Sequence, residues 1–295
     1  MGIGKSDIRV IDYKKYVTGF AEEDVVLKKY AKPQTTSAST FVWYQQTAGF
    51  IAPATTTGMT ANLIDNVANR ALPPVAGPTF TKKTSYVRKY MVESETMSIE
   101  DIKESLVDLR VTTLRQLMRA VASRVDTRIY NVGTESLSPS TILTTAAVAD
   151  GWDDVATGNP IKDILTGLRK IRQNGYVIDS SRKGVLYINS IEHENLMNYL
   201  ITVKGSSNPD FANKLLGAGA VMEIFNLDVV VSENATTDYA WIFIPQVTFS
   251  WYTFTPMTSA EIVDEGIGLK LRVWEEGEAT LDNPKSSHLT TDTVV

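Results

Sequence analysis

The sequence predicts an α+β protein, and three features of the 295-residue chain lead to that prediction. Residues 33–78 carry few charges and are rich in Thr, aromatic residues, Pro and Gly, a composition that favours strands and limits helices. Residues 98–130 place apolar side chains at helical spacing. Short apolar segments of strand length then dominate residues 227–274. With 43% apolar residues, the chain can bury a substantial core.

The first third of the chain is expected to be extended. Residues 1–32 are polar, charged and weakly periodic, and they predict an N-terminal arm. Residues 33–91 predict a long, strand-rich loop, whose last part alternates and is interpreted as a returning strand. Loops of this length are usually functional or lie against another molecule.

An aromatic cluster within this loop is a candidate association surface. Its members are Phe41, Trp43, Tyr44 and Phe50, in a segment with little charge. Large apolar groups outside a self-contained core usually mark a contact with another chain. The alternative is that the segment folds back on itself and forms a small hairpin core.

The clearest helix is predicted over residues 98–130. Ser98 followed by Glu100 and Asp101 resembles a capping box. Acidic residues crowd the first turns and arginines the later ones, which complements the helix dipole. A helix of this length spans about 50 Å and can act as a strut.

The rest of the chain predicts a compact α+β domain over residues 151–259. Asn159-Pro160 is typical of a helix start and Asn174-Gly175 of its end. A second helix is expected, with Ser190 as its cap, to about residue 202. Strands are expected at residues 185–188, 227–232, 239–245, 247–255 and 268–274. The polar residues 286–295 are expected to form a loose tail.

Composition excludes most enzyme chemistry. The chain has no Cys and only two His, which removes thiolate chemistry and leaves little for metal sites or triads. We therefore expect no enzyme activity, no cofactor and no metal. If the chain were an enzyme, Asp264, Glu275 and Glu276 would be the candidate acid–base groups.

The charge balance bears on partners. Twenty-nine basic and thirty-four acidic residues give a net charge of −5, which argues against a dedicated nucleic-acid reader. The N-terminus lacks an apolar signal segment, and no stretch approaches the ~20 apolar residues of a membrane helix. The sequence therefore predicts a soluble protein with no membrane partner.

Charged residues complete the candidate interface. Lys82, Lys83, Arg88 and Lys89 are the densest basic positions, and they predict salt bridges between subunits, with phosphate contacts as the alternative. The acidic residues after the last predicted strand are interpreted as a solvated surface. The predicted subunit interface comprises Phe41, Trp43, Tyr44, Phe50, Lys82, Lys83, Arg88, Lys89, Glu275 and Glu276.

In its order of elements, the chain resembles the major capsid proteins of tailed double-stranded-DNA viruses, which share the Hong Kong 97-type fold. The closing segment Arg272-Val273-Trp274-Glu275-Glu276-Gly277 resembles the family's last strand. The resemblance implies the following domains: an arm at residues 1–32, an extended loop at 33–91, a peripheral domain at 92–150 and 260–285 with a spine helix at 98–130, an axial domain at 151–259, and a flexible tail at 286–295.

The resemblance also implies a function and partners. The chain would assemble with itself into hexamers and pentamers of an icosahedral virion capsid around DNA, in the host cytoplasm. A separate scaffolding protein, a portal and a decoration protein are expected as further partners. The alternative is an encapsulin-type compartment that holds cargo enzymes, with a cargo-peptide groove near residues 17–20 and 106–117.

Overall fold

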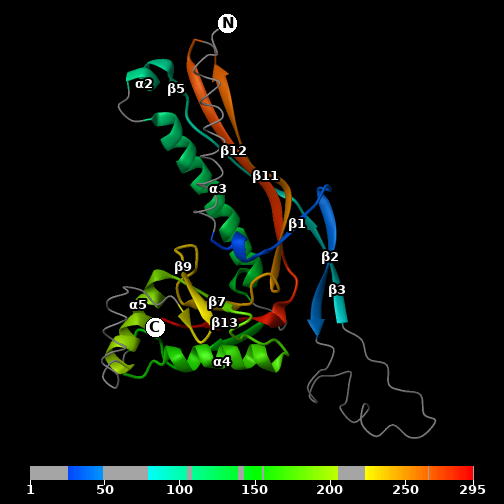
Figure 1. The fold of residues 1–295 in the computed structure, drawn as a ribbon, viewed down its shortest axis with the longest axis vertical. Helices are drawn as coiled ribbons and strands as arrows, with labels where there is room; N and C mark the ends of the chain where they lie inside the picture. The colour runs from blue at the N-terminus through cyan, green and yellow to red at the C-terminus, as the bar shows by residue number, and fades with distance from the viewer. Residues whose placement is uncertain are drawn as a thin grey trace, which may run out of the picture. The chain divides into compact units, whose positions relative to one another are not determined.

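The fold is described by a computed structural model over residues 26–48, 79–104, 108–138, 143–154, 156–204, 223–264 and 266–294. The described chain divides into two compact units (Figure 1). Unit 1 contains the described residues of 26–41, 85–132 and 250–280, and unit 2 contains those of 42–84, 133–249 and 281–294. Each unit has its own sheet, so each is considered separately.

Unit 1 is built on a five-stranded sheet whose first strand begins at the last residue of the predicted arm and continues into the predicted loop. The strand order is β1-β11-β12-β4, and β5 also pairs with β12. The bounds are β1 Lys32–Thr35, β4 Arg88–Glu93, β5 Met97–Ser98, β11 Phe249–Asp264 and β12 Gly268–Leu281. Strand β1 runs parallel to β11, whereas β4 and β5 run antiparallel to β12.

Helices of unit 1 cover this sheet through apolar side chains. The helical segments are the short η1 (Lys28–Tyr30), α2 (Ile99–Glu104) and α3 (Leu109–Gly133). Buried side chains of α3 contact buried side chains of β12 in one cluster: Leu114, Leu117, Met118, Val121, Leu269, Leu271 and Val273. Each such side chain contributes about 1.5–3 kcal/mol to folding.

The predicted helix over residues 98–130 is described as two helices, each with its own start. The Ser98 hydroxyl accepts the Asp101 N–H at 2.9 Å, which confirms the predicted cap. The Asp108 carboxylate accepts the Val111 N–H at 3.3 Å, so a new helix begins there. The sequence pattern missed this second start because the apolar spacing continues on both sides of Asp108.

Unit 2 contains a six-stranded mixed sheet in the order β6-β13-β10-β7-β9-β8. Its strands are β6 Thr144–Ala147, β7 Gly184–Ile188, β8 Glu223–Ile224, β9 Leu227–Val231, β10 Tyr239–Phe243 and β13 Ser287–Thr291. Its helical segments are η3 Glu135–Leu137, α4 Pro160–Gln173, α5 Ser190–Tyr199, the π-helical turn Leu200–Lys204 and η5 Pro284–Ser286. A separate two-stranded sheet, β2 (Thr40–Ala48) with β3 (Thr79–Tyr86), is described below.

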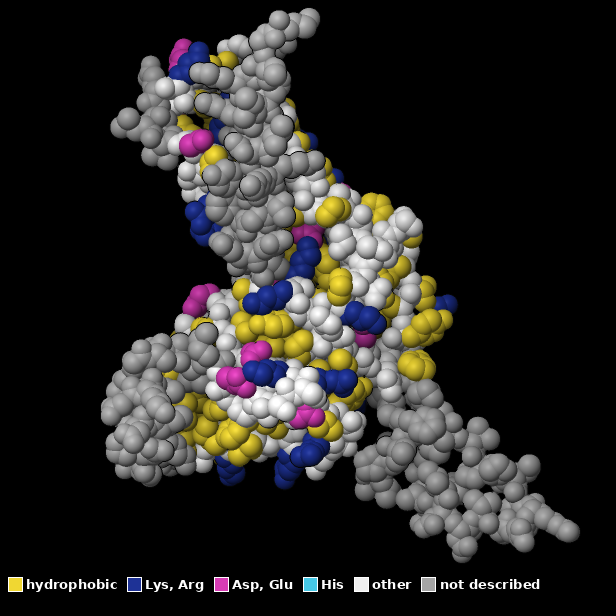
Figure 2. All heavy atoms as spheres, viewed as in Figure 1, with side chains coloured by type: hydrophobic (Ala, Val, Ile, Leu, Met, Phe, Trp, Pro, Cys, Tyr) yellow, Lys and Arg dark blue, Asp and Glu magenta, His cyan; other side chains and the backbone are white. Residues whose placement is uncertain are grey.

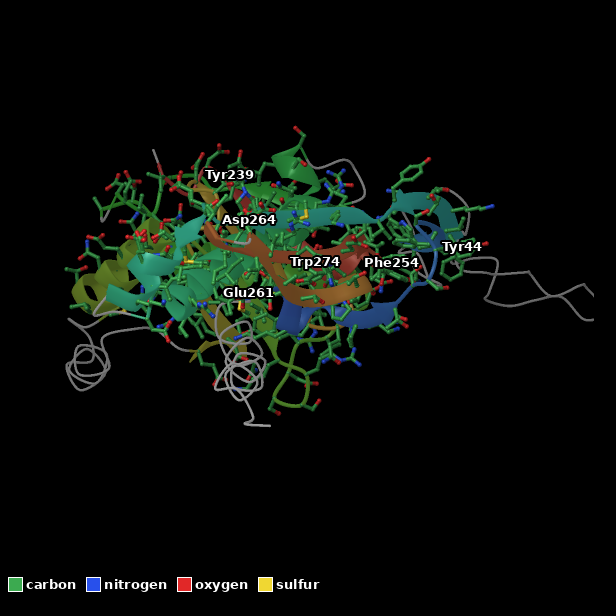
Figure 3. The ribbon with its side chains drawn as sticks, turned by 90° about the horizontal axis from the view of Figure 1, so that it is seen from above. Tyr44, Tyr239, Phe254, Glu261, Asp264 and Trp274 are labelled. Carbon is green, nitrogen blue, oxygen red and sulfur yellow. The ribbon has the colours of Figure 1, made fainter. Side chains whose placement is uncertain are left out.

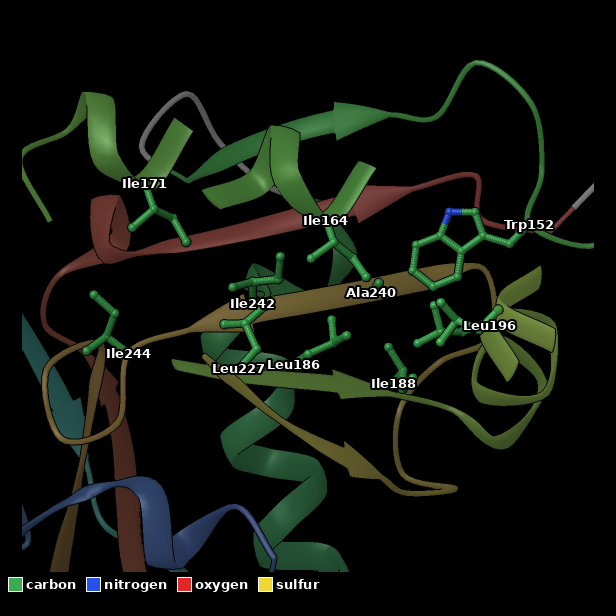
Figure 4. Packing of buried hydrophobic residues seen from close by; sticks show 11 residues of the cluster. Trp152, Ile164, Ile171, Leu186, Ile188, Leu196, Leu227, Ala240, Ile242 and Ile244 are labelled. Atoms are coloured by element: carbon green, nitrogen blue, oxygen red, sulfur yellow. The ribbon is translucent and has the colours of Figure 1, made fainter. Parts of the chain in front are cut away.

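The six-stranded sheet has buried side chains on both faces. On one face, Ile242 and its neighbours form a core with α4 and α5 (Figure 4). The alternate residues of β10, Trp241 and Phe243, point to the other face, since successive strand residues alternate sides. Their rings contact each other with centroids 4.3 Å apart, and both side chains are fully buried. Burial on both faces explains why this strand is an almost unbroken apolar run.

Both predicted helices of this unit are present, and one cap differs. The Asn159 side chain accepts the Lys162 N–H at 3.1 Å and Gly175 has φ +87°, which confirms the start and end of α4. In α5 the capping side chain belongs to Asn189, which accepts the Ile191 N–H at 3.2 Å. The prediction that Ser190 caps this helix is therefore wrong by one residue.

The prediction of a loose tail at residues 286–295 is wrong for residues 286–294. Strand β13 lies between β6 and β10, and Ser287, His288 and Leu289 are fully buried. The segment is polar but its Ser and Thr side chains are small enough for a packed sheet, and they hydrogen-bond locally, as Ser287 Oγ does to the Pro284 carbonyl at 3.1 Å. Polarity alone therefore misled the prediction. Val295 lies outside the described residues.

Two of the expected bounds lie inside longer strands. Strand β11 continues to Asp264 in unit 1, so the expected end of the axial domain at residue 259 falls inside a strand. Strand β12 continues to Leu281, beyond the expected residue 274. Residues 143–150, expected in the peripheral domain, lie in unit 2.

None of the described helices has the length and apolar content that crossing a bilayer requires.

Acid is expected to destabilise unit 2 through His288. Burial, and then the charge of Lys170, lower the pKa of this fully buried imidazole to about 4 from its ordinary 6.5. Between these values the unfolded chain binds the proton more tightly, so stability is lost as the pH falls. From pH 7 to pH 5 we expect a loss of about 2 kcal/mol.

The free energy of unfolding of unit 2 is measured by urea unfolding at the two pH values. Hydrogen exchange at the β10 and β13 amides monitors this unfolding. The variant His288→Gln removes the titration and should show a clearly smaller difference between pH 7 and pH 5. An equal difference in the variant would mean that other groups cause the acid sensitivity.

Candidate subunit interface

The hairpin formed by β2 and β3 uses one side to attach to its own unit. Trp43 is 8% exposed, Gln45 is fully buried, and the Lys83 ammonium lies 5.7 Å from the centre of the Trp43 ring. The Gln45 side-chain amide donates to the Leu281 carbonyl at 2.7 Å. The Gln46 N–H donates to the Asp282 carbonyl at 3.0 Å. These contacts fix which side of the hairpin faces outward.

The opposite side, here called the hairpin outer face, consists of the alternate residues Val42, Tyr44, Phe80, Lys82 and Thr84. Val42, Tyr44 and Phe80 are 49%, 62% and 55% exposed, and Lys82 and Thr84 are also exposed. Figure 2 shows exposed hydrophobic side chains in the region where Figure 1 places this hairpin. Exposed aromatic groups gathered on one small sheet face are typical of a protein–protein contact.

The structure divides the predicted aromatic cluster. Phe41 stacks on Tyr252 of β11 with ring centroids 4.4 Å apart, so it contributes to packing within unit 1. Trp43 is buried in its own unit, as the hairpin-core alternative expects. Tyr44 remains exposed, as the association-surface prediction expects. Phe50 lies outside the described residues.

The acidic end of β12 is buried, which contradicts its interpretation as a solvated surface. Glu275 is fully buried and binds the Lys28 ammonium, and Glu278 is 2% exposed. One Glu278 oxygen accepts Arg88 Nε at 3.0 Å, and the other accepts Arg128 at 2.7 Å. Buried carboxylates require such partners because desolvation of an unpaired charge costs several kcal/mol.

Tyr90 is part of this charged cluster. It pairs with Glu275 across β4 and β12, and its ring lies 6.4 Å from that of Trp251. Burial, and then the charge of Glu278, raise the pKa of Tyr90 to about 12. The phenol therefore stays neutral beside two carboxylates at physiological pH.

The other face of the β4–β12 pair carries a partly exposed ladder. Lys89 binds Glu276 at 3.1 Å, and Arg272 binds Glu93 at 2.6 Å. Trp274 lies opposite Met91 between these two ion pairs. Figure 3 labels Trp274 on β12 and Phe254 on the neighbouring strand β11.

The predicted interface residues thus separate into two groups. Tyr44 and Lys82 lie together on the hairpin outer face. Lys83 lies over Trp43, and the remaining charged residues make ion pairs within the chain: Arg88, Lys89, Glu275 and Glu276. These charges have partners within the chain, and their bridging of subunits stays a prediction.

Sequence reasoning missed Val42 and Phe80 as interface candidates. The available signal was the two-residue period of the strands, which places Val42 beside Tyr44 and Phe80 beside Lys82. It also missed Lys28 and Arg128, which neutralise the buried carboxylates from positions 247 and 150 residues away. No local pattern reveals partners at such separations.

Two of the three candidate acid–base groups make ion pairs within the chain: Glu275 binds Lys28, and Glu276 binds Lys89. The third, Asp264, lies at the end of β11. Within the described ranges, no three His, Asp or Glu side chains gather as a metal site requires.

Solved structures of a cyanophage capsid, a virus-like particle and a mycobacterium phage have a similar arrangement of elements. The capsid of cyanophage P-SCSP1u matches with a TM-score of 0.64 and 10% identity, over 90% of this chain and 88% of that chain. A virus-like particle from Pyrococcus furiosus matches with a TM-score of 0.61 and 12% identity, over 94% and 96%. Mycobacterium phage Che8 matches with a TM-score of 0.58 and 14% identity, over 93% and 92%.

The chain has the Hong Kong 97-like capsid fold. This confirms the fold class that the order of elements implied. No protein-family model matches the sequence, and no curated protein matches it significantly. At 8–14% identity, the Hong Kong 97-like fold is preserved by the positions of its strands and helices rather than by shared side chains.

Proposed function

We propose that the protein is the major capsid protein of a tailed double-stranded-DNA virus, assembling into hexamers and pentamers of an icosahedral shell. The observation that carries the proposal is the fold match over 90–94% of the chain to a cyanophage capsid, a virus-like particle and a mycobacterium phage. In this proposal unit 1 corresponds to the peripheral domain and unit 2 to the axial domain. Scaffolding, portal and decoration proteins are further proposed partners in the host cytoplasm.

The hairpin outer face is the proposed contact with the neighbouring subunit. It carries the exposed apolar side chains of Val42, Tyr44 and Phe80 and is attached to its own unit by the opposite side, so contact with a second chain would not disturb the core. Tyr is among the residues that most often dominate binding energy, at 2 kcal/mol or more for a well-buried anchor.

Replacing Tyr44 and Phe80 together by Asp is expected to prevent assembly. Two carboxylates on this face would be desolvated on association, and we expect the assembled fraction to fall at least tenfold. Folding should persist because both side chains are exposed. Electron microscopy and size-exclusion chromatography measure the assembled fraction.

The matched control is Val177→Asp, at an apolar residue of unit 2 that is 42% exposed and lies outside the hairpin. We expect this variant to assemble as the wild type does. Normal particles from the double hairpin variant would contradict the proposed contact, and a wild-type protein that stays monomeric under assembly conditions would contradict the shell function itself.

An encapsulin-type compartment is the second candidate, because unit 1 has a groove where a cargo peptide would be expected. Its volume is about 730 Å³, and its lining includes Leu109, Thr113 and Leu117 of α3. The other predicted part, residues 17–20, lies outside the described residues. Nuclease-protected DNA inside purified particles would support the virus, whereas a co-purifying enzyme without nucleic acid would support the compartment.

A further inference from the structure

The N-terminal arm is attached to α3 through one buried carboxylate. Asp126 is 1% exposed and lies in the second half of the helix. One of its oxygens accepts the Val26 N–H at 2.9 Å, and both oxygens accept the Leu27 N–H, at 3.2 and 3.3 Å. An acidic side chain from elsewhere in the chain thus caps the start of the short helix η1, where backbone N–H groups have no partner of their own.

The attachment involves few residues and lies at the first described residues of the chain. Leu27 is fully buried, and the Lys28 ammonium continues the contact by binding Glu275 of β12. After η1 the chain enters β1, which pairs with β11 through backbone hydrogen bonds. Residues 26–28 therefore attach the described end of the N-terminal arm to α3 and β12.

We propose that the Asp126 carboxylate holds the N-terminal arm on α3 at Leu27, a contact here called the Asp126 clasp. This contact opens more often as the solution changes from acidic to neutral. The charged group that faces Asp126 from η1 is Lys28, which is itself bound to Glu275 of β12. The other groups that contact the carboxylate are backbone N–H groups. A single lysine, shared with a second carboxylate, only partly offsets the desolvation of the Asp126 charge.

The direction of the pH effect follows because the desolvation of the Asp126 charge exceeds its compensation by Lys28. Burial raises the pKa of Asp126 from 3.8 to about 6, against the lowering effects of the backbone N–H groups and Lys28. The closed clasp therefore favours the protonated acid, which can still accept a hydrogen bond through its carbonyl oxygen. Its stability is fully present below pH 3.8 and is lost as the pH rises through 6. From pH 5 to pH 7 the equilibrium constant for closing should fall about tenfold.

The test is hydrogen exchange of the full-length protein at pH 5 and pH 7, with protection factors corrected for the intrinsic rate at each pH. The readout is the peptide that contains Val26 and Leu27, and peptides of β12 report the rest of unit 1. In the wild type we expect about tenfold higher protection of the arm peptide at pH 5. The β12 peptides should not show this change.

Two variants distinguish the role of Asp126 as a hydrogen-bond acceptor from the role of its negative charge. Asp126→Asn retains an oxygen acceptor without a titratable charge, so its arm protection should be the same at both pH values within about twofold. Asp126→Ala has no acceptor, so its arm protection should be at least tenfold below the wild-type value at pH 5. The control, Asp179→Asn, changes an exposed aspartate in unit 2 that also accepts backbone N–H groups, at 2.8 and 2.9 Å, and should behave as the wild type.

Three results would overturn the proposal: no pH dependence in the wild type, an unchanged pH dependence in Asp126→Asn, or wild-type arm protection in Asp126→Ala. If Asp126→Ala lost protection throughout unit 1, the near-isosteric Asp126→Asn would still decide the question, because its β12 peptides report whether unit 1 remains folded.

Discussion

Replacing Trp241 by Ala is expected to destabilise unit 2 by about 3–5 kcal/mol, the range for removing a large aromatic side chain from a core. Trp241 is fully buried in β10, and its ring contacts Tyr187, Phe243 and Phe249, with centroids 6.3, 4.3 and 5.6 Å away. Gly133 fits against the indole so closely that an added Cβ would lie 2.3 Å from it. The surrounding backbone and rings therefore have little freedom to collapse into the space.

The matched control is the same substitution at Trp274, which is only half-buried and lies opposite the exposed Met91. We expect Trp274→Ala to cost less than about 1.5 kcal/mol, because solvent already contacts part of the ring. Since the two units need not unfold together, hydrogen exchange of the β7, β10 and β13 amides should follow unit 2 separately from unit 1. Equal losses at the two positions would mean that Trp241 is not a central packing residue.

Elements whose signals are local could be predicted from the sequence. Helix α4 is fixed by Asn159-Pro160 at its start and Asn174-Gly175 at its end, and both signals act within one turn. Strands β7, β9 and β10 follow from short apolar runs. The fold class followed from the order of such elements, even though no single motif is diagnostic.

Features that depend on distant partners could not be predicted. Glu275 and Glu278 look like a solvated acidic end because their cationic partners Lys28 and Arg128 lie on other elements, 247 and 150 positions away. Strand β13 looks like a tail because its Ser, His and Thr side chains are polar, yet β6 and β10 on either side satisfy its backbone. In both cases burial is decided by tertiary neighbours, and composition reports only the average preference of each residue type.

The residues of the candidate interface could be predicted only in part, again because contacts with distant residues decide which side chains are buried. An aromatic cluster in a weakly charged segment drew attention to the hairpin, but adjacent strand residues point to opposite sides. Trp43 therefore attaches the hairpin to its own unit while Tyr44 faces outward. Which of the two alternating sets faces outward is decided by the contacts of Gln45 and Gln46 with residues 281 and 282, and these are not visible in the local sequence.

The buried carboxylate Glu278 leads to the second large expected effect. Replacing Arg128 by Met should destabilise unit 1 by about 3 kcal/mol, because Glu278 would keep only Arg88, whose side chain is 58% exposed. The control is Arg272→Met, which breaks the Arg272–Glu93 pair. That pair is shorter than 3 Å but has side chains 39% and 33% exposed, so solvent screens it and the expected loss is below about 1 kcal/mol.

A double variant distinguishes a buried charge from lost packing as the cause. In Arg128→Met with Glu278→Leu, no uncompensated carboxylate remains, and apolar replacements of a buried ion pair are often neutral. We therefore expect the double variant to recover most of the stability that Arg128→Met loses, as measured by urea unfolding with hydrogen exchange at the β12 amides. Additive losses of unfolding free energy from the two substitutions would mean that the Arg128 guanidinium stabilises unit 1 through packing. The burial of Glu278 in the folded chain would then not require its charge to be neutralised.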